Sequence, residues 1–134
     1  MKIKLAGVMV LGWGLVFLSG CAKAPHLRPG YEAPEEVALG YHEAVRWQDY
    51  DEARANVMPS AQAAFDRFVA DNSKNLNIID IDVQLLDLAE DGYVAHIKVK
   101  RSYFMTPSVN QQEQELLQTW KLMNGKWLLS GPPF

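Results

Sequence analysis

The sequence predicts an α+β domain in which N-terminal helices pack on a curved four-stranded antiparallel sheet. Apolar residues recur at helical spacing over about residues 34–70, and they alternate with polar residues after Asn75. The two patterns occupy separate parts of the chain, an order that is typical of α+β folds rather than of doubly wound α/β sheets. A length of 134 residues leaves room for one such core.

The first helix is predicted to begin at Pro34, which favours the first helical turn and is followed by two acidic residues. The apolar stripe that faces the core consists of Val37, Tyr41, Ala44 and Val45. His42 lies about 100° round the helix from Tyr41. We therefore expect His42 on the flank of this helix.

Two shorter helices are predicted to follow. We expect Asp51 to cap the second helix, which Pro59 ends. Ser60 is expected to cap a third helix that runs to about Ala70. The sequence Asp71-Asn72-Ser73 is a stop-and-turn signal before the strands.

The first hairpin is predicted to turn at Glu90-Asp91-Gly92, because only a three-residue turn brings the apolar sides of its strands together. A two-residue turn would set Val83 opposite Lys100 and point a charge into the core. The expected cross-strand pairs are Ala89 with Tyr93, Leu85 with Ile97, Val83 with Val99, Asp82 with Lys100, and Asp80 with Ser102. Gly92 supplies the left-handed residue that ends such a turn.

The second hairpin is predicted to turn at Asn124-Gly125, the preferred pair for a two-residue type I′ turn. This turn sets Leu122 opposite Trp127 and Trp120 opposite Leu129. The side chains that then share one apolar face are Leu116, Trp120, Leu122, Trp127 and Leu129. The final residues, Gly131-Pro132-Pro133-Phe134, cannot continue a central strand.

The N-terminal segment has the pattern of a secretory signal. Lys2 and Lys4 precede an uncharged run from Leu5 to Leu18, which is shorter than the roughly 20 residues that a membrane-spanning helix needs. The run ends in Leu18-Ser19-Gly20-Cys21. This stretch resembles the lipobox of bacterial lipoproteins, although an ordinary signal peptide followed by an unrelated cysteine is the alternative.

The lipobox resemblance implies cleavage between Gly20 and Cys21, a lipid on the Cys21 thiol and acylation of the new N-terminus. Residues 1–20 are then a removed signal peptide, 21–33 a lipidated tether and 34–134 a single α+β domain. Ala22 favours sorting to the outer membrane, facing the periplasm. The membrane itself is thus the first expected partner, through the lipid on Cys21.

The segment PEEVALGYHEAVRWQDYDEARANV is similar to the opening of nuclear transport factor 2-like domains, and TWKLMNGKWLL resembles their closing hairpin. The resemblance covers about residues 34–131 and implies a cone-like fold, with a cystatin-like sheet as the alternative. It is closest to small bacterial lipoproteins of unknown function. Some enzymes of this fold carry an Asp or His base in the cone, but no residue here matches such a base.

Composition excludes several classes of function. The chain has 13 basic and 16 acidic residues, which argues against a nucleic-acid partner. Its single cysteine rules out an intramolecular disulfide and a multi-cysteine zinc site. We find no nucleophile–base pair, glycine-rich phosphate loop or metal-spaced cluster. We therefore predict no catalytic residue, no metal ligand and no cofactor.

Arg101 is the candidate ligand-binding residue, together with Tyr103. The alternation of its strand places Arg101 on the apolar side near Ile81, where Tyr41, Tyr93 and Gln118 are also expected. An inward arginine there would line the open end of the cone and bind an anionic or polar ligand. The alternative is that the side chain extends past the covered part of the sheet into solvent.

Three functions follow from these observations. The first is a lipid-anchored envelope protein whose non-catalytic domain binds another protein or envelope component. The second is a domain that binds a small molecule through Arg101. The third, for which no residue can be named, is an isomerase-like or hydrolase-like enzyme.

Replacement of Cys21 by serine is expected to leave an unacylated precursor, because the lipid is attached to the thiol. Mass spectrometry of the mature N-terminus measures this directly. An unmodified N-terminal peptide that begins elsewhere than Cys21 in the natural chain would contradict the lipoprotein prediction.

Overall fold

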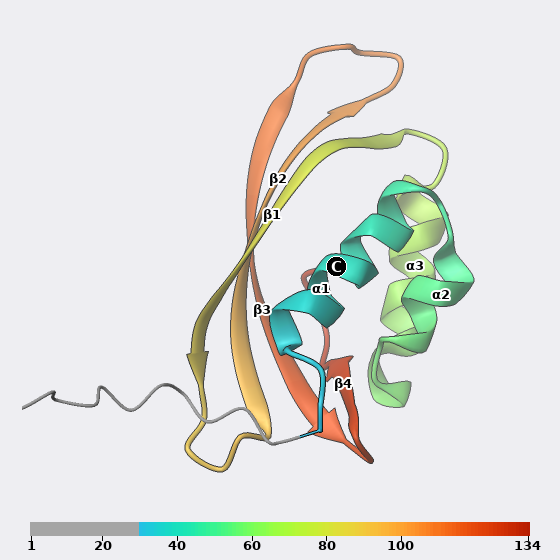
Figure 1. Cartoon of the computed structure of the whole chain (residues 1–134). Helices are drawn as coiled ribbons and strands as arrows, with labels where there is room; N and C mark the ends of the chain where they lie inside the picture. Colours follow the sequence, from blue (N-terminus) through green and yellow to red (C-terminus); the bar gives the residue numbers. More distant parts are fainter. Residues whose placement is uncertain (1–29) are drawn as a thin grey trace, which may run out of the picture.

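A computed structural model describes residues 30–134, and these residues confirm the predicted α+β class (Figure 1). Three α-helices and a four-stranded antiparallel sheet make up the described part of the chain. The predicted signal peptide, Gly20, Cys21 and most of the tether lie outside the described residues.

The helices and strands follow each other along the chain in separate groups. The helical elements are α1 (Pro34–Arg46), α2 (Tyr50–Ala55), a short 3₁₀ turn (Pro59–Ala61) and α3 (Gln62–Asn72). The strands are β1 (Leu76–Leu88), β2 (Val94–Met105), β3 (Gln112–Met123) and β4 (Lys126–Leu129). The strands lie in the sheet in the order of the sequence, β1-β2-β3-β4.

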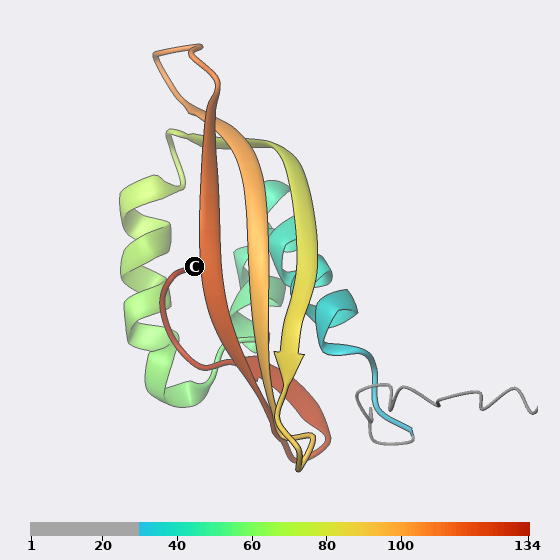
Figure 2. The ribbon, with the colours of Figure 1, turned by 90° about the vertical axis from the view of Figure 1, so that its left-hand side faces the viewer.

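All three helices lie on one side of the twisted sheet, and the opposite side has no helix over it (Figures 1 and 2). The core fills the space between these layers. Its largest fully buried apolar side chains are Trp120, Tyr41, Phe65, Ile97 and Leu129. Burial of side chains of this size contributes about 1.5–3 kcal/mol each.

Helix α1 begins at Pro34 as predicted, and Glu35 and Glu36 occupy its first turn. The predicted cap of α2 is wrong. Asp49, not Asp51, is the N-cap residue, and its carboxylate accepts a hydrogen bond from the backbone N–H of Glu52 at 3.3 Å.

The predicted cap of α3 is also wrong. Ser60 lies inside the 3₁₀ turn Pro59–Ala61, and α3 begins only at Gln62 without a side-chain cap. The turn is held by a backbone hydrogen bond from Ala61 N–H to the carbonyl of Met58, at 2.8 Å. This bond satisfies a backbone group at the start of the helical segment, where a serine cap was expected.

The register of the first hairpin agrees with the prediction along most of its length. Val83 pairs with Val99, Leu85 with Ile97, Asp82 with Lys100, and Asp80 with Ser102. The predicted three-residue turn, which set Ala89 opposite Tyr93, is wrong, because the register shifts between Leu85 and Asp87 and leaves four residues between Ala89 and Val94. A bulge of this kind adds one residue to β1, and Ala89 instead donates a backbone hydrogen bond to Val94 at 2.8 Å.

The second hairpin has the predicted two-residue turn. Asn124 and Gly125 both have positive φ, at +51° and +78°, as a type I′ turn requires. Leu122 pairs with Trp127 and Trp120 with Leu129. The resulting apolar face is buried against the helices.

Both ends of the described chain are attached to the rest of the domain. The indole N–H of Trp127, beside the β3–β4 turn, donates a hydrogen bond to the carbonyl of Glu32 at 3.0 Å. The C-terminal segment turns back along β3 on the side of α3 (Figure 2), where Phe134 packs against Phe65 and Phe68. Within residues 30–134, no helix is long and apolar enough to cross a membrane.

Replacement of Gly92 by valine is expected to destabilise the domain by about 1–2 kcal/mol. Gly92 has φ +75°, a conformation that a β-branched residue adopts only with strain. Chemical denaturation measures the free energy of unfolding. Gly40→Ala in α1 is the control, since open space surrounds this helical glycine and alanine there should stabilise the helix. A neutral Gly92→Val would contradict the left-handed turn.

Candidate functional site

Arg101 occupies the middle of β2 on the side of the sheet that faces the helices. It pairs with Ile81 of β1 and Gln114 of β3, and only 4% of its surface is exposed. Successive side chains of a strand alternate between faces, so Val99 and Arg101 share the inner face while Lys100 lies on the outer one. The guanidinium does not reach bulk solvent, which rules out the alternative prediction.

The buried guanidinium has few partners. Its Nε donates a hydrogen bond to the Oε1 of Gln114 at 3.0 Å, and its Nη1 is buried without a partner. None of the ion pairs within residues 30–134 includes Arg101. Burial lowers the pKa of Arg101, but a guanidinium stays protonated at neutral pH. The site therefore holds a positive charge that no described carboxylate neutralises.

A cavity of about 480 Å³ lies beside Arg101, between the sheet, α3 and the C-terminal segment. The residues that line it are Phe68, Asn72, Leu76, Arg101, Tyr103, Met105, Gln114, Leu116, Pro132, Pro133 and Phe134. Both predicted ligand-binding residues, Arg101 and Tyr103, are thus brought to one cavity. The Tyr103 hydroxyl donates a hydrogen bond to the Oε1 of Gln112 at 3.1 Å.

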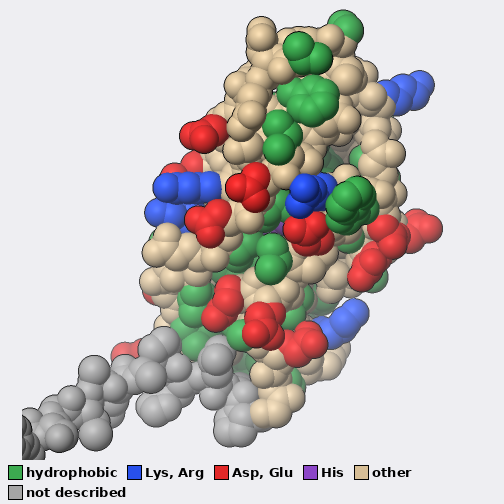
Figure 3. All heavy atoms as spheres, turned by 45° about the horizontal axis from the view of Figure 1, so that its top comes forward, with side chains coloured by type: hydrophobic (Ala, Val, Ile, Leu, Met, Phe, Trp, Pro, Cys, Tyr) green, Lys and Arg blue, Asp and Glu red, His purple; other side chains and the backbone are tan. Residues whose placement is uncertain are grey.

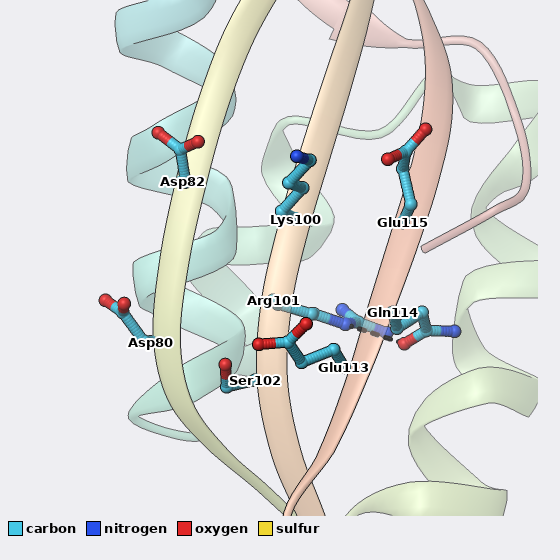
Figure 4. Close-up of a pocket in the computed structure, with 8 residues that line it drawn as sticks. All are labelled: Asp80, Asp82, Lys100, Arg101, Ser102, Glu113, Gln114 and Glu115. Carbon is cyan, nitrogen blue, oxygen red and sulfur yellow. Dashed lines mark hydrogen bonds between the residues drawn. The ribbon is translucent and has the colours of Figure 1, made fainter.

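The outer side of the sheet has a smaller, more polar pocket of about 380 Å³ (Figure 4). Asp82, Lys100 and Glu115 stand on this side, while Arg101 passes behind β2 toward Gln114. Lys100 has the predicted strand partner, Asp82, but no ion pair joins their side chains. The outer charges are therefore solvated, and they leave Arg101 without a counter-ion.

His42 is fully buried, and the prediction that it lies on the helix flank is wrong. Its Nε2 lies 3.0 Å from the Oε1 of Gln118, 76 positions away in sequence. Burial lowers the pKa of His42 to about 4; the Gln118 hydrogen bond opposes this shift, and the charge of Arg101 adds to it. The imidazole is therefore neutral at physiological pH.

The hydrogen bonds of Gln118 determine the tautomer of His42. The amide Nε2 donates to the carbonyl of Pro133 at 2.9 Å, and the Oε1 accepts from the indole N–H of Trp120 at 3.2 Å. Since the oxygen therefore faces His42, the His42 Nε2 carries the proton and donates it. The Nδ1 is left as a buried acceptor without a partner.

Tyr41 completes a buried polar cluster with His42 and Arg101. The hydroxyl of Tyr41 has no hydrogen-bond partner, and burial raises its pKa while the charge of Arg101 opposes that shift. Its ring packs edge-on against His42 and Trp120, with centroid distances of 4.8 and 5.7 Å. Neither Tyr41 nor His42 lines the cavity beside Arg101, so neither is in position to act on a molecule bound there.

Sequence reasoning identified some of these residues and missed others. Gln118 was expected beside Arg101 and is buried, whereas Tyr93 is 42% exposed near the opposite end of β2. The contribution of Gln114 was missed, although it shares the strand parity of Leu116 and Gln118. No local sequence pattern indicates that His42 is buried and bonded to Gln118.

The described residues contain no group of three or more His, Cys, Asp or Glu side chains that could hold a metal ion. Arg101, Gln114 and Tyr103 offer hydrogen-bond donors and acceptors at an apolar cavity. This arrangement is suited to holding an oxyanion that is attached to an apolar body.

Comparison of the chain with protein-family models, with curated proteins and with solved structures finds no match. The function of the chain is therefore inferred from its sequence and from the geometry of this site.

The stability of the domain is expected to fall by about 3 kcal/mol as the pH is lowered from 6.5 to 4. The unfolded chain protonates His42 near its ordinary pKa of 6.5, whereas the folded chain does so only near 4. Between pH 6.5 and 4 the unfolded state therefore binds more protons than the folded state. Lowering the pH stabilises the unfolded state relative to the folded one. Urea denaturation at a series of pH values measures the slope. His42→Gln keeps a hydrogen-bond donor and should flatten it, and an unchanged slope would contradict this assignment.

Proposed function

We propose that this chain is a lipid-anchored protein of the bacterial cell envelope whose domain binds a small anionic ligand without transforming it. The observation that carries the proposal is Arg101. Its side chain is 4% exposed and lines a cavity, its Nη1 has no partner, and no described carboxylate pairs with it. An uncompensated buried charge costs several kcal/mol, and a bound anion would offset that cost.

The anchor in this proposal is supported by the sequence Leu18-Ser19-Gly20-Cys21, which resembles a lipobox. Lipidation of Cys21 would retain the domain at a membrane, and Ala22 favours the outer membrane on its periplasmic side. Two or more acyl chains on one residue give the stable anchoring that a single chain does not.

We further propose that the fold is the cone-like one of nuclear transport factor 2-like domains. The helices cover one side of a twisted sheet (Figure 1). A cavity lies between this sheet, α3 and the C-terminal segment. These features support a cone-like arrangement over a cystatin-like one, because the cavity lies between the helical layer and the sheet.

Replacement of Arg101 by methionine is expected to abolish the binding of small anions while the domain stays folded, because methionine keeps much of the apolar stem. The probes are hexanoate and inorganic phosphate. The measurement is the rise in the thermal unfolding midpoint of the full chain, kept in a nonionic detergent.

Lys100→Met is the matched control, since it removes the same charge one position away on the outer side of the sheet. This variant should keep the response to the probes. If neither probe stabilises the natural chain, the anion-binding proposal fails. An envelope protein would then be the proposed partner.

A further inference from the structure

The walls of the Arg101 cavity are chemically unequal. Arg101 and Gln114 form a polar corner where β2 and β3 pair. Most of the remaining lining is apolar: Phe68, Leu76, Met105, Leu116, Pro132, Pro133 and Phe134. A small hydrophilic anion would satisfy the corner and leave these walls against water, whereas a neutral apolar molecule would leave Arg101 unpaired.

Burial decreases along the cavity from this corner toward the end of the sheet. Arg101 and Leu116 are buried, whereas Leu76 and Met105, which pair across β1 and β2, are only half-buried. The cavity therefore has a charged inner part and an apolar opening.

Apolar surface continues beyond this opening toward the β2–β3 loop. Val109 in the loop is 83% exposed. Figure 3 shows apolar side chains gathered at this end of the molecule. An extended apolar group that leaves the cavity would thus meet further apolar surface.

We propose that the ligand is a single-chain amphiphile with an anionic head group, a carboxylate or a phosphate monoester. The head group binds Arg101, and the alkyl chain runs along the apolar wall past Leu76 and Met105. This inference rests on the proposed function and adds the class of ligand. A planar guanidinium is suited to both head groups, and the volume of about 480 Å³ is typical of ligand pockets.

The test is a chain-length series with matched head groups. The probes are hexanoate, octanoate, decanoate and dodecanoate, with dodecyl phosphate and the neutral dodecanol for comparison. Affinities are taken from thermal-stabilisation titrations of the full chain at one fixed concentration of nonionic detergent. Because micelles take up long probes more than short ones, each affinity is expressed against the free concentration of its probe, which is measured by equilibrium dialysis against the same detergent solution without protein.

In the natural protein, each pair of methylenes added to the probe is expected to tighten binding roughly tenfold, until the alkyl chain extends out of the cavity. Dodecanol should bind at least tenfold more weakly than dodecanoate. Arg101→Met should remove that preference, and Lys100→Met should keep it. The tighter of dodecanoate and dodecyl phosphate identifies the head group, and either result supports the proposal.

Met105→Gln tests the path of the alkyl chain. This variant should reduce the increase in affinity from hexanoate to dodecanoate severalfold, and it should leave the affinity for hexanoate unchanged. Phe104→Gln, one position away on the other side of the sheet, is the control and should change neither. Leu76→Asn on the facing strand gives the same readout if Met105→Gln fails to fold.

Two results overturn the amphiphile proposal while anion binding stands. One is equal affinity for hexanoate and dodecanoate in the natural chain, and the other is a chain-length gain that Met105→Gln and Leu76→Asn leave intact. Binding of dodecanol as tight as that of dodecanoate overturns the role of the charged head group. If none of the anions binds, the proposed function fails together with this inference.

Discussion

The side-chain amide of Gln118 joins three parts of the domain, and the shape of the cavity depends on it. Its oxygen accepts hydrogen bonds from His42 of α1 and Trp120 of β3, and its nitrogen donates to the carbonyl of Pro133. Pro132 and Pro133 have no N–H of their own, so this segment has few ways to bind to the sheet. Gln118 and the packing of Phe134 against α3 therefore position one wall of the cavity.

The same buried region sets the charge of the site. Arg101 is held out of water with one neutral hydrogen-bond partner, an arrangement that costs stability. The positive charge of Arg101 also disfavours a second positive charge on His42, which burial already keeps neutral. The interior thus keeps a single positive charge across the physiological pH range, and the surrounding apolar core supplies the stability that this requires.

The sequence predicted the strands better than the helix ends. The turn Asn124-Gly125 and the alternation of apolar residues were enough to obtain both hairpin registers, and with them the inward position of Arg101. The bulge beyond Leu85 could not be predicted, because one extra residue in a strand leaves no clear pattern. The cap of α2 was assigned to the wrong residue because two aspartates of equal capping ability, Asp49 and Asp51, stand two positions apart. Helix α3 has no side-chain cap, because a 3₁₀ turn precedes it.

The candidate site shows a different limit of prediction from the sequence. His42 was placed on the helix flank because a single apolar stripe was assumed to face the core. The buried arc of α1 also includes Ala38 and His42, since the helix packs against both the sheet and α2. The partner that makes this burial tolerable, Gln118, lies far away in the sequence, and only the folded chain shows the pair. The cavity wall formed by Phe134 is likewise a product of tertiary packing.

The attachment of Glu32 to Trp127 has a mechanical consequence. A pull on the chain at Glu32 passes along the backbone into α1 and, through this hydrogen bond, into the β3–β4 hairpin. Arg101 lies nearer the other end of the sheet, on β2, so the load is shared among the ladders of inter-strand hydrogen bonds before it reaches the cavity (Figure 1). A force applied at Glu32 is therefore divided between a helix and a hairpin before it reaches the residues around Arg101.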